Sequence, residues 1–100
     1  MLIQFSVFPF TKGLSIRAHV AKALEELDKA GLPYRVTDMG TIVEGEWETL
    51  MPALKRIHDR LLSDTERVYM TLSLDSRRDK KVPLGAKVLA VESQLGKKLS

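Results

Sequence analysis

The chain has 100 residues, of which 44% are apolar and 29% charged, with a formal net charge of +3 and no cysteine. This composition is typical of a single folded domain, residues 1–100, and excludes both a disordered chain and a disulfide framework. No apolar run approaches the roughly 18 residues that span a bilayer, and the apolar N-terminus lacks the features of a signal peptide. We therefore expect a cytoplasmic protein.

The charges are unevenly distributed along the chain. Residues 76–100 carry seven basic and two acidic side chains, a local net charge of +5, whereas residues 1–75 carry nine basic and eleven acidic ones, a net charge of −2. A basic C-terminal part can favour nucleic acid or other anions. A solvated surface of mixed charge is the simpler explanation.

A strand is predicted over residues 2–8, because apolar and polar side chains alternate there, and Pro9 is expected to end it. A helix of residues 15–30 follows, with Ser15 as its N-cap and Gly31 at its C-terminal end. Its apolar residues recur at the spacing of a helix: Ile16, Val20, Ala23, Leu24 and Leu27.

A hairpin is predicted from strands of residues 34–38 and 41–44 that turn at Met39 and Gly40. Symmetry about this turn pairs Val36 with Val43, and both side chains are expected to face the core. The pairs Thr37 with Ile42 and Arg35 with Glu44 are expected on the opposite face of the sheet.

A second helix is predicted over about residues 46–62, with an acidic first turn that suits the helix dipole. Pro52 is expected to kink this helix or to delay its start, and Trp47 lies on its apolar stripe, which favours a place in the core. A last strand is predicted over residues 67–75. Pro83 is then expected to open a final helix with apolar residues at helical spacing: Leu84, Val88, Val91 and Leu95.

The predicted order is β-α-β-β-α-β with a further helix at the C-terminus. Right-handed crossovers turn this order into a ferredoxin-like α+β sandwich, in which two helices cover one face of a four-stranded antiparallel sheet. Strand parity gathers mainly short polar side chains on the open face, and such side chains suit close approach by a small polar ligand or a second copy of the sheet. They are Gln4, Ser6, Arg35, Thr37, Glu44, Tyr69, Thr71, Ser73 and Asp75.

Patterns that would indicate an enzyme are not found in the sequence. His19 and His58 have no metal-ligand spacing, and there is neither a nucleophile elbow nor a phosphate-binding loop. We therefore expect no catalysis, no cofactor and no metal. Ion pairs explain the charged side chains more simply: Glu44 with Arg35, and Asp75 and Asp79 with Arg77 and Arg78.

The stretch TDMGTIVEGEW, residues 37–47, resembles the T-x-MGT-x-x-EG-x-W signature of the small thiamine-binding protein family, relatives of the YkoF-like thiamine- and hydroxymethylpyrimidine-binding proteins. The segments SVFP, SLDSRRDK and KVLAVES are similar to further parts of that family. The resemblance implies a non-catalytic, cytoplasmic homodimer or homotetramer. Such a protein would bind thiamine or its hydroxymethylpyrimidine moiety on the open sheet face or at a subunit interface.

The resemblance also implies a set of site residues. In that reading Glu44 accepts a hydrogen bond from the aminopyrimidine and offsets the thiazolium charge. Phe8, Tyr69 or Trp47 stacks on the ring, although the apolar stripe favours a place in the core for Trp47. Arg77 and Arg78 contact either an anion such as phosphate or, as we favour, the neighbouring subunit. The expected ligand-binding residues are Ser6, Thr37, Met39, Gly40, Thr41 and Glu44.

Two other functions stay open. A structural or regulatory oligomer without a ligand would bury the polar face in a subunit contact. An RNA-binding module shares the order of elements and the basic C-terminal part, but such modules stack bases on aromatic side chains of the two central strands. Those strands instead present Gln4, Ser6, Ile42 and Glu44, and the carboxylate would repel phosphate. We therefore do not expect a nucleic acid or a membrane as partner.

Overall fold

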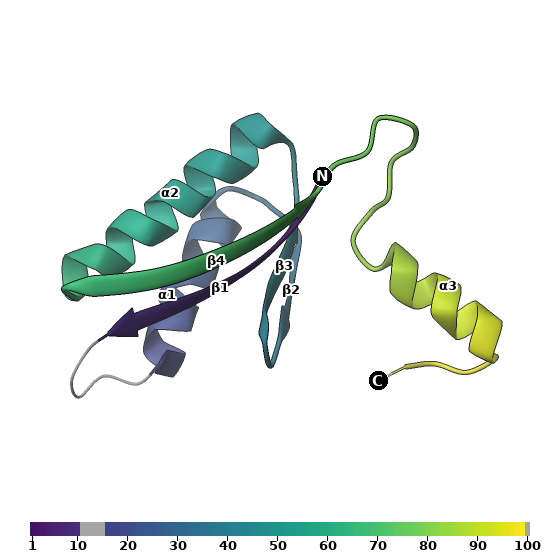
Figure 1. Ribbon diagram of the computed structural model, residues 1–100, viewed down its shortest axis with the longest axis horizontal. Helices are drawn as coiled ribbons and strands as arrows, with labels where there is room; N and C mark the ends of the chain where they lie inside the picture. Colours follow the sequence, from purple (N-terminus) through teal and green to yellow (C-terminus); the bar gives the residue numbers. More distant parts are fainter. Residues whose placement is uncertain (11–15, 100) are drawn as a thin grey trace.

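The computed structural model describes residues 1–10 and 16–99. Its strands form one antiparallel sheet in the order β2-β3-β1-β4, and two helices cover one face of that sheet (Figure 1). The predicted ferredoxin-like α+β fold is therefore confirmed. The described elements are β1 (Leu2–Phe10), α1 (Ile16–Lys29), β2 (Tyr34–Thr37), β3 (Gly40–Glu44), α2 (Trp47–Asp64), β4 (Arg67–Asp75) and α3 (Ala86–Leu95).

The core lies between the sheet and the pair α1 and α2. Ile3 and Phe5 point from β1 toward these helices and are almost fully buried, as their alternation with polar neighbours predicts. Both helices supply the apolar stripes that the 3.6-residue period predicts. The buried apolar residues are Ile3, Phe5, Ala23, Leu27, Leu32, Val43, Leu50, Ala53, Leu54, Ile57 and Leu61.

β1 is two residues longer than predicted, because Pro9 lies inside the strand instead of ending it. β3 pairs with β1 only as far as Phe5, whereas β4 pairs with it as far as Phe10. At Pro9 the strand therefore has a neighbour on one side only. A residue without an N–H is tolerated at such an edge position.

The hairpin turns one residue earlier than predicted, at Asp38 and Met39. Thr37 lies directly opposite Gly40, and its hydroxyl closes the turn. Its Oγ1 donates to the carbonyl oxygen of Gly40 over 2.9 Å and accepts from the N–H of Met39 over 3.3 Å. The side chain of Thr37 is therefore engaged in the turn itself.

The pairing across the hairpin is shifted by two residues from the prediction. Val36 lies opposite Thr41 on the edge strand and is 49% exposed, so its predicted place in the core is wrong. Arg35 lies opposite Ile42 and forms no ion pair with Glu44, so that predicted pair is wrong as well. A shift by two residues leaves each side chain on the same face of the sheet, so the faces predicted for the side chains of β3 are correct.

The helices differ from the prediction mainly at their ends. α2 begins at Trp47 and runs through Pro52, which removes one internal hydrogen bond without ending the helix. The buried stripe of α2 starts one turn later, at Leu50, so that Trp47 is 55% exposed and its predicted place in the core is wrong. The predicted N-cap of α1, Ser15, lies outside the described residues.

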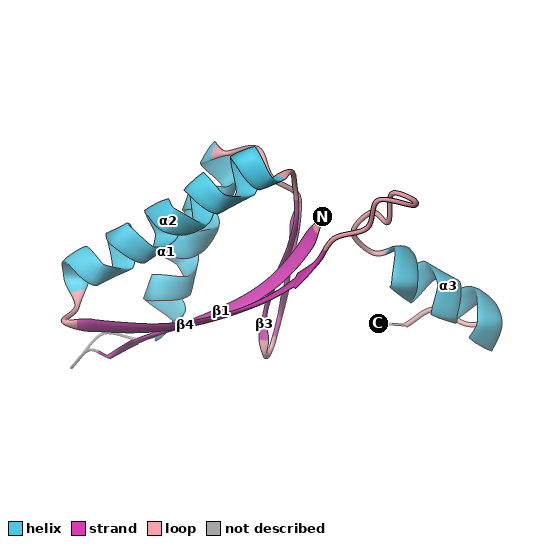
Figure 2. Ribbon diagram, turned by 45° about the horizontal axis from the view of Figure 1, so that its top comes forward, coloured by secondary structure: helices cyan, strands magenta, loops and turns pink. Residues whose placement is uncertain are grey.

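α3 stands apart from the two-layer sandwich, beyond the end of the sheet at which Met1 lies (Figures 1 and 2). It begins at Ala86 rather than at Pro83. Gly85 precedes it with a φ of +88°, a backbone conformation that glycine adopts without strain. None of the described helices combines the length and the apolar character needed to cross a membrane.

Candidate functional site

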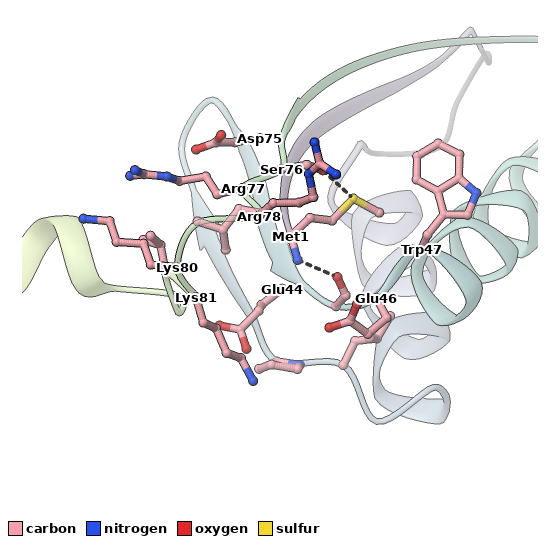
Figure 3. Close-up of a pocket in the computed structure, with 15 residues that line it drawn as sticks. Met1, Glu44, Glu46, Trp47, Asp75, Ser76, Arg77, Arg78, Lys80 and Lys81 are labelled. Atoms are coloured by element: carbon pink, nitrogen blue, oxygen red, sulfur yellow. Dashed lines mark hydrogen bonds between the residues drawn. The ribbon is translucent and has the colours of Figure 1, made fainter.

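A cavity of about 670 Å³ opens at the end of the sheet where β1 begins and where β3 and β4 end (Figure 3). Its walls come from stretches that are far apart in the sequence: the start of β1, the connection between α1 and β2, the end of β3 with the start of α2, and the loop after β4. The lining residues are Met1, Leu2, Leu32, Pro33, Glu44, Gly45, Glu46, Trp47, Asp75, Ser76, Arg77, Arg78, Lys80, Lys81 and Val82.

Glu44 is the last residue of β3 and lines this cavity with a half-buried side chain. Its Oε1 accepts a hydrogen bond of 2.5 Å from the backbone N–H of Leu84. A carboxylate has about four acceptor positions, so that one such bond leaves most of the acceptor capacity of Glu44 for a ligand. Glu44 thus offers a partly desolvated negative charge inside a cavity.

Backbone hydrogen bonds hold the wall next to Glu44 in place. The amino nitrogen of Met1 donates to the carbonyl oxygen of Gly45 over 2.9 Å, and the N–H of Gly45 donates back to the carbonyl oxygen of Met1 over 3.0 Å. A Cβ at Gly45 would lie 2.7 Å from the end of the Leu32 side chain, so a larger residue there would require that side chain to shift. The exposed side chains of Glu46 and Trp47 follow directly at the rim.

The loop after β4 brings basic side chains to the opposite wall. Arg77 forms two hydrogen bonds with Asp79, of 3.0 and 2.6 Å, and these bonds hold the pKa of that carboxyl below its usual value. The predicted pairing of these two residues is therefore confirmed, and Figure 3 shows the Arg77 side chain turned away from Glu44. Among the described residues, neither Arg78 nor Lys81 has an ion-pair partner.

The open face of the sheet has two distinct ends. Near the cavity it is polar, and the hydroxyl groups of Ser6 and Thr71 are hydrogen-bonded to each other across 2.8 Å. At the far end Phe8 lies opposite Tyr69, and Phe10 meets Phe8 edge-on with their ring centroids 5.2 Å apart. All three rings are 44–57% exposed. The hydroxyl-lined surface predicted from strand parity therefore exists, but an aromatic cluster adjoins it.

Of the six predicted ligand-binding residues, only Glu44 lines the cavity in the described part of the chain. Thr41 is 6% exposed and faces the helices, so it does not belong to the open face. Arg77 and Arg78, predicted to contact an anion or a subunit, both line the cavity. The other four lie outside the cavity, on the open face or at the hairpin turn: Ser6, Thr37, Met39 and Gly40.

Most of the lining residues were not predicted as site residues. For Trp47 the core was favoured over stacking on a ligand, and the structure instead places its side chain at the rim of the cavity. Glu46 was predicted in the acidic first turn of the second helix and Lys81 in the loop after the last strand, and nothing in their spacing indicates that they meet. Only the fold brings them to one cavity.

Comparison with known proteins supports the likeness seen in the sequence. The sequence profile of a family described as "Thiamine-binding protein" matches residues 3–92, which include the TDMGTIVEGEW stretch. The chain belongs to the thiamine-binding protein family. The resemblance inferred from the sequence is therefore confirmed, and the membership gives the chain a thiamine-related role.

Relatives of this family member cover nearly the whole chain. A UPF0045 protein of Methanothermobacter thermautotrophicus is 37% identical over 95 residues, which cover 92% of this chain and 96% of the relative. The crystal structure of a hypothetical protein from Methanocaldococcus jannaschii, 33% identical, superposes with a TM-score of 0.82 over 90% of this chain and 93% of the other. A domain of unknown function from Bacillus cereus, 28% identical, superposes with a TM-score of 0.80 over 93% and 90% of the two chains.

Proposed function

We propose that this protein binds thiamine, or its hydroxymethylpyrimidine moiety, in the cavity at the end of the sheet. The observation that carries the proposal is the half-buried carboxylate of Glu44 inside a cavity of about 670 Å³, in a chain of the thiamine-binding protein family. Sites for small molecules typically enclose about 300–1,000 Å³ and orient their ligand with a few polar groups. The cavity and its carboxylate match this description.

The chemistry of the wall suits an aminopyrimidine that carries a cationic ring. Glu44 retains acceptor positions for the exocyclic amine or the protonated pyrimidine nitrogen. Glu46 at the rim supplies a second negative charge for the thiazolium ring. Trp47, 55% exposed at the same rim, offers a flat apolar surface on which a heteroaromatic ring can stack.

The proposed role is binding without catalysis, in a homodimer or homotetramer. Support for binding is the character of the wall, which combines the acceptor Glu44 with the exposed ring of Trp47 as a stacking surface. Recovery of thiamine after long incubation with the protein tests this part directly. Mass spectrometry is expected to find the ligand chemically unchanged, and a cleaved or modified product would show that the protein is an enzyme.

Calorimetric titration with thiamine and with hydroxymethylpyrimidine tests the proposal. Saturable binding is expected for the wild-type protein. Glu44→Gln is expected to weaken binding by about tenfold or more, because a hydrogen bond to a charged group contributes roughly 1.5–3 kcal/mol. Glu48→Gln is the matched control, since Glu48 is exposed in the first turn of α2 and does not line the cavity.

Two results would contradict the proposal. Flat titrations of the wild-type protein up to millimolar ligand would exclude binding of both compounds. Equal affinities of wild type, Glu44→Gln and Glu48→Gln would leave binding intact but place it away from Glu44. The first result would favour the alternative of a structural or regulatory oligomer without a ligand.

A further inference from the structure

The cavity has two sides of opposite charge. Glu44 and Glu46 line it where β3 ends and α2 begins. The loop after β4 lines the other side with four basic side chains: Arg77, Arg78, Lys80 and Lys81. Separated charges of this kind favour a ligand whose two ends also differ in charge. Thiamine itself has a cationic ring and no negative group, so it matches the acidic side alone.

Two charged residues on the loop side are already neutralised by partners in the chain. Arg77 is held by Asp79 through two hydrogen bonds. Asp75, the acidic residue that lines the cavity at the end of β4, has Lys87 Nζ 4.0 Å from a carboxylate oxygen. The charge that remains on this side of the cavity is therefore positive.

That remaining charge belongs to three side chains. Within residues 1–10 and 16–99, the side chains of Arg78, Lys80 and Lys81 form neither a hydrogen bond nor an ion pair. Figure 3 shows the Lys80 side chain pointing away from the cavity. The Arg78 side chain extends toward Met1, and the Lys81 side chain lies on the side of Glu44. Arg78 and Lys81 are thus two exposed, unpaired cations at the mouth of the cavity.

A direct ion pair between Glu44 and Lys81 would neutralise both groups. The structure has no such pair, and Glu44 Oε1 is instead bound by the backbone N–H of Leu84 over 2.5 Å. A backbone donor occupies one acceptor position of the carboxylate and leaves the lysine untouched. The negative charge of Glu44 and the positive charges of Lys81 and Arg78 therefore all remain available to a ligand.

We propose that the preferred ligand of this cavity is a phosphate monoester, in which Glu44 binds the aminopyrimidine and Arg78 and Lys81 bind the phosphate. Hydroxymethylpyrimidine and thiamine each have one alcohol group that can carry the phosphate. A phosphate monoester has a charge of about −1.5 to −2 at pH 7 and three strong acceptor oxygens. The proposal deepens the proposed function and rests on it for the aminopyrimidine end.

The two cations suit a phosphate in different ways. The guanidinium of Arg78 can donate two parallel hydrogen bonds to phosphate oxygens, and the ammonium of Lys81 acts as a point charge. The volume of about 670 Å³ lies within the range of sites for small molecules. Between the two roles that the sequence left open for Arg78, an anion contact or a subunit contact, this assignment selects the anion.

Calorimetric titrations in a buffer without phosphate test the proposal. The ligands are thiamine, thiamine monophosphate, hydroxymethylpyrimidine and hydroxymethylpyrimidine phosphate. Each ester is expected to bind the wild-type protein about tenfold or more tightly than its parent alcohol, because charged hydrogen bonds to the phosphate are added. Inorganic phosphate is expected to bind about tenfold or more weakly than either ester, since it lacks the ring that Glu44 binds.

Variants of the basic side locate the phosphate. Arg78→Gln and Lys81→Gln are each expected to reduce the affinity for the esters by about three- to tenfold, because charged hydrogen bonds at exposed positions contribute less than buried ones. Arg78→Lys keeps the charge and is expected to lose less than Arg78→Gln. Lys97→Gln is the matched control: it removes one positive charge from an exposed side chain beyond α3 that does not line the cavity. Its preference for the esters is expected to equal that of the wild type.

The results separate this proposal from the proposed function. Saturable binding of thiamine with no tighter binding of either ester would overturn the phosphate assignment and leave the thiamine site standing. Binding of the esters alone would support the phosphate assignment and exclude the unphosphorylated compounds as ligands. Flat titrations with all four compounds would overturn both.

Three further results would overturn the assignment of the phosphate to Arg78 and Lys81. One is an unchanged preference for the esters in both Arg78→Gln and Lys81→Gln. Another is an equal loss of that preference in Lys97→Gln, which would show an effect of net charge alone. The third is binding of cytidine monophosphate as tightly as hydroxymethylpyrimidine phosphate, which would assign the cavity to nucleotides in general.

Discussion

The carboxylate of Glu44 on β3 accepts a hydrogen bond of 2.5 Å from the backbone N–H of Leu84, at the base of α3. This bond joins two residues 40 positions apart in the sequence. One side chain therefore contacts both the cavity and the segment that leads into α3. The ligand site and the position of α3 are linked through Glu44.

This link predicts different effects for two substitutions of the same residue. Glu44→Ala removes the acceptor of the Leu84 N–H, and we expect amide hydrogen exchange at Leu84 to accelerate about tenfold, since such a bond contributes roughly 1 kcal/mol. Glu44→Gln keeps an oxygen acceptor, so that exchange is expected to stay near the wild-type rate while ligand affinity falls. Equal exchange rates in wild type and Glu44→Ala would show that this hydrogen bond does not fix the start of α3.

The exposed Trp47 provides a second test at the cavity. It is the only tryptophan of the chain, so its fluorescence reports on the rim of the cavity directly. We expect thiamine to quench this fluorescence and Trp47→Ala to weaken binding by about tenfold, in line with roughly 1–3 kcal/mol for a stacked ring. Ser6→Ala, on the open face outside the cavity, is expected to leave the affinity unchanged.

An opposite outcome is equally informative. Unchanged affinity in Trp47→Ala together with weakened binding in Ser6→Ala would move the ligand from the cavity to the polar end of the open face. In that case the hydroxyl pair of Ser6 and Thr71 would be the contact to examine next.

Gly40 is expected to matter for packing. A Cβ at this position would lie 2.8 Å from the backbone carbonyl oxygen of Phe5, a distance that requires one of the two strands to shift. Gly40→Ala is therefore expected to lower the free energy of unfolding by about 1–3 kcal/mol in urea denaturation. A stability equal to that of the wild type would show that the two strands can move apart at little cost in free energy. Gly40 would then again be a candidate ligand contact.

A charged cluster between α1 and α2 predicts a dependence of stability on pH. Glu26, with its side chain 8% exposed, accepts a hydrogen bond of 2.9 Å from Arg60 and lies 3.4 Å from Lys29. Burial by itself would raise the pKa of Glu26, but hydrogen bonds from Arg60 and Lys29 and their positive charges outweigh burial and lower that pKa below its ordinary value. The ionised carboxylate is therefore favoured in the folded state.

The sign of the effect follows from linkage. Because the folded-state pKa of Glu26 is depressed, its contribution is present above the unfolded value of about 4.3 and is lost as the pH falls through the folded-state value. Glu26→Gln is expected to lower the free energy of unfolding by about 1–3 kcal/mol at neutral pH and by progressively less in acid. Glu48→Gln is the control, and a pH-independent difference between Glu26→Gln and wild type would contradict the expectation.

The hydrophobic periodicity predicted the architecture because each core strand or helix repeats an apolar pattern over several residues or turns. The alternation around Ile3 and Phe5 indicated the buried face of β1, and the apolar stripes of α1 and α2 indicated the buried faces of the two helices. The hairpin register was not predictable in this way. Turns at Asp38-Met39 and at Met39-Gly40 both keep alternate residues on the same faces, so alternation does not distinguish them. The observed turn, at Asp38-Met39, is the one in which the Thr37 hydroxyl bonds to Gly40 and Met39.

The candidate site was predictable only in part. Parity placed Glu44 at the end of β3, and the family signature singled it out. The remaining wall comes from the start of β1, the β3–α2 connection and the loop after β4, which have no periodicity by which their meeting could be foreseen. The sequence did not predict that α3 lies apart from the sheet. An apolar stripe on a helix shows that the helix can pack against another surface, but not which surface that is.

The location of the ligand is tested most directly by nuclear magnetic resonance titration of ¹⁵N-labelled protein with thiamine. We expect saturable shifts of the backbone amides around the cavity, in residues 44–47 and 76–82 above all, while the amides of α1 stay in place. The same titration of Glu44→Gln is expected to show these shifts only at higher thiamine concentrations. Shifts confined to residues outside the cavity, or none at saturating thiamine, would contradict a thiamine site at Glu44.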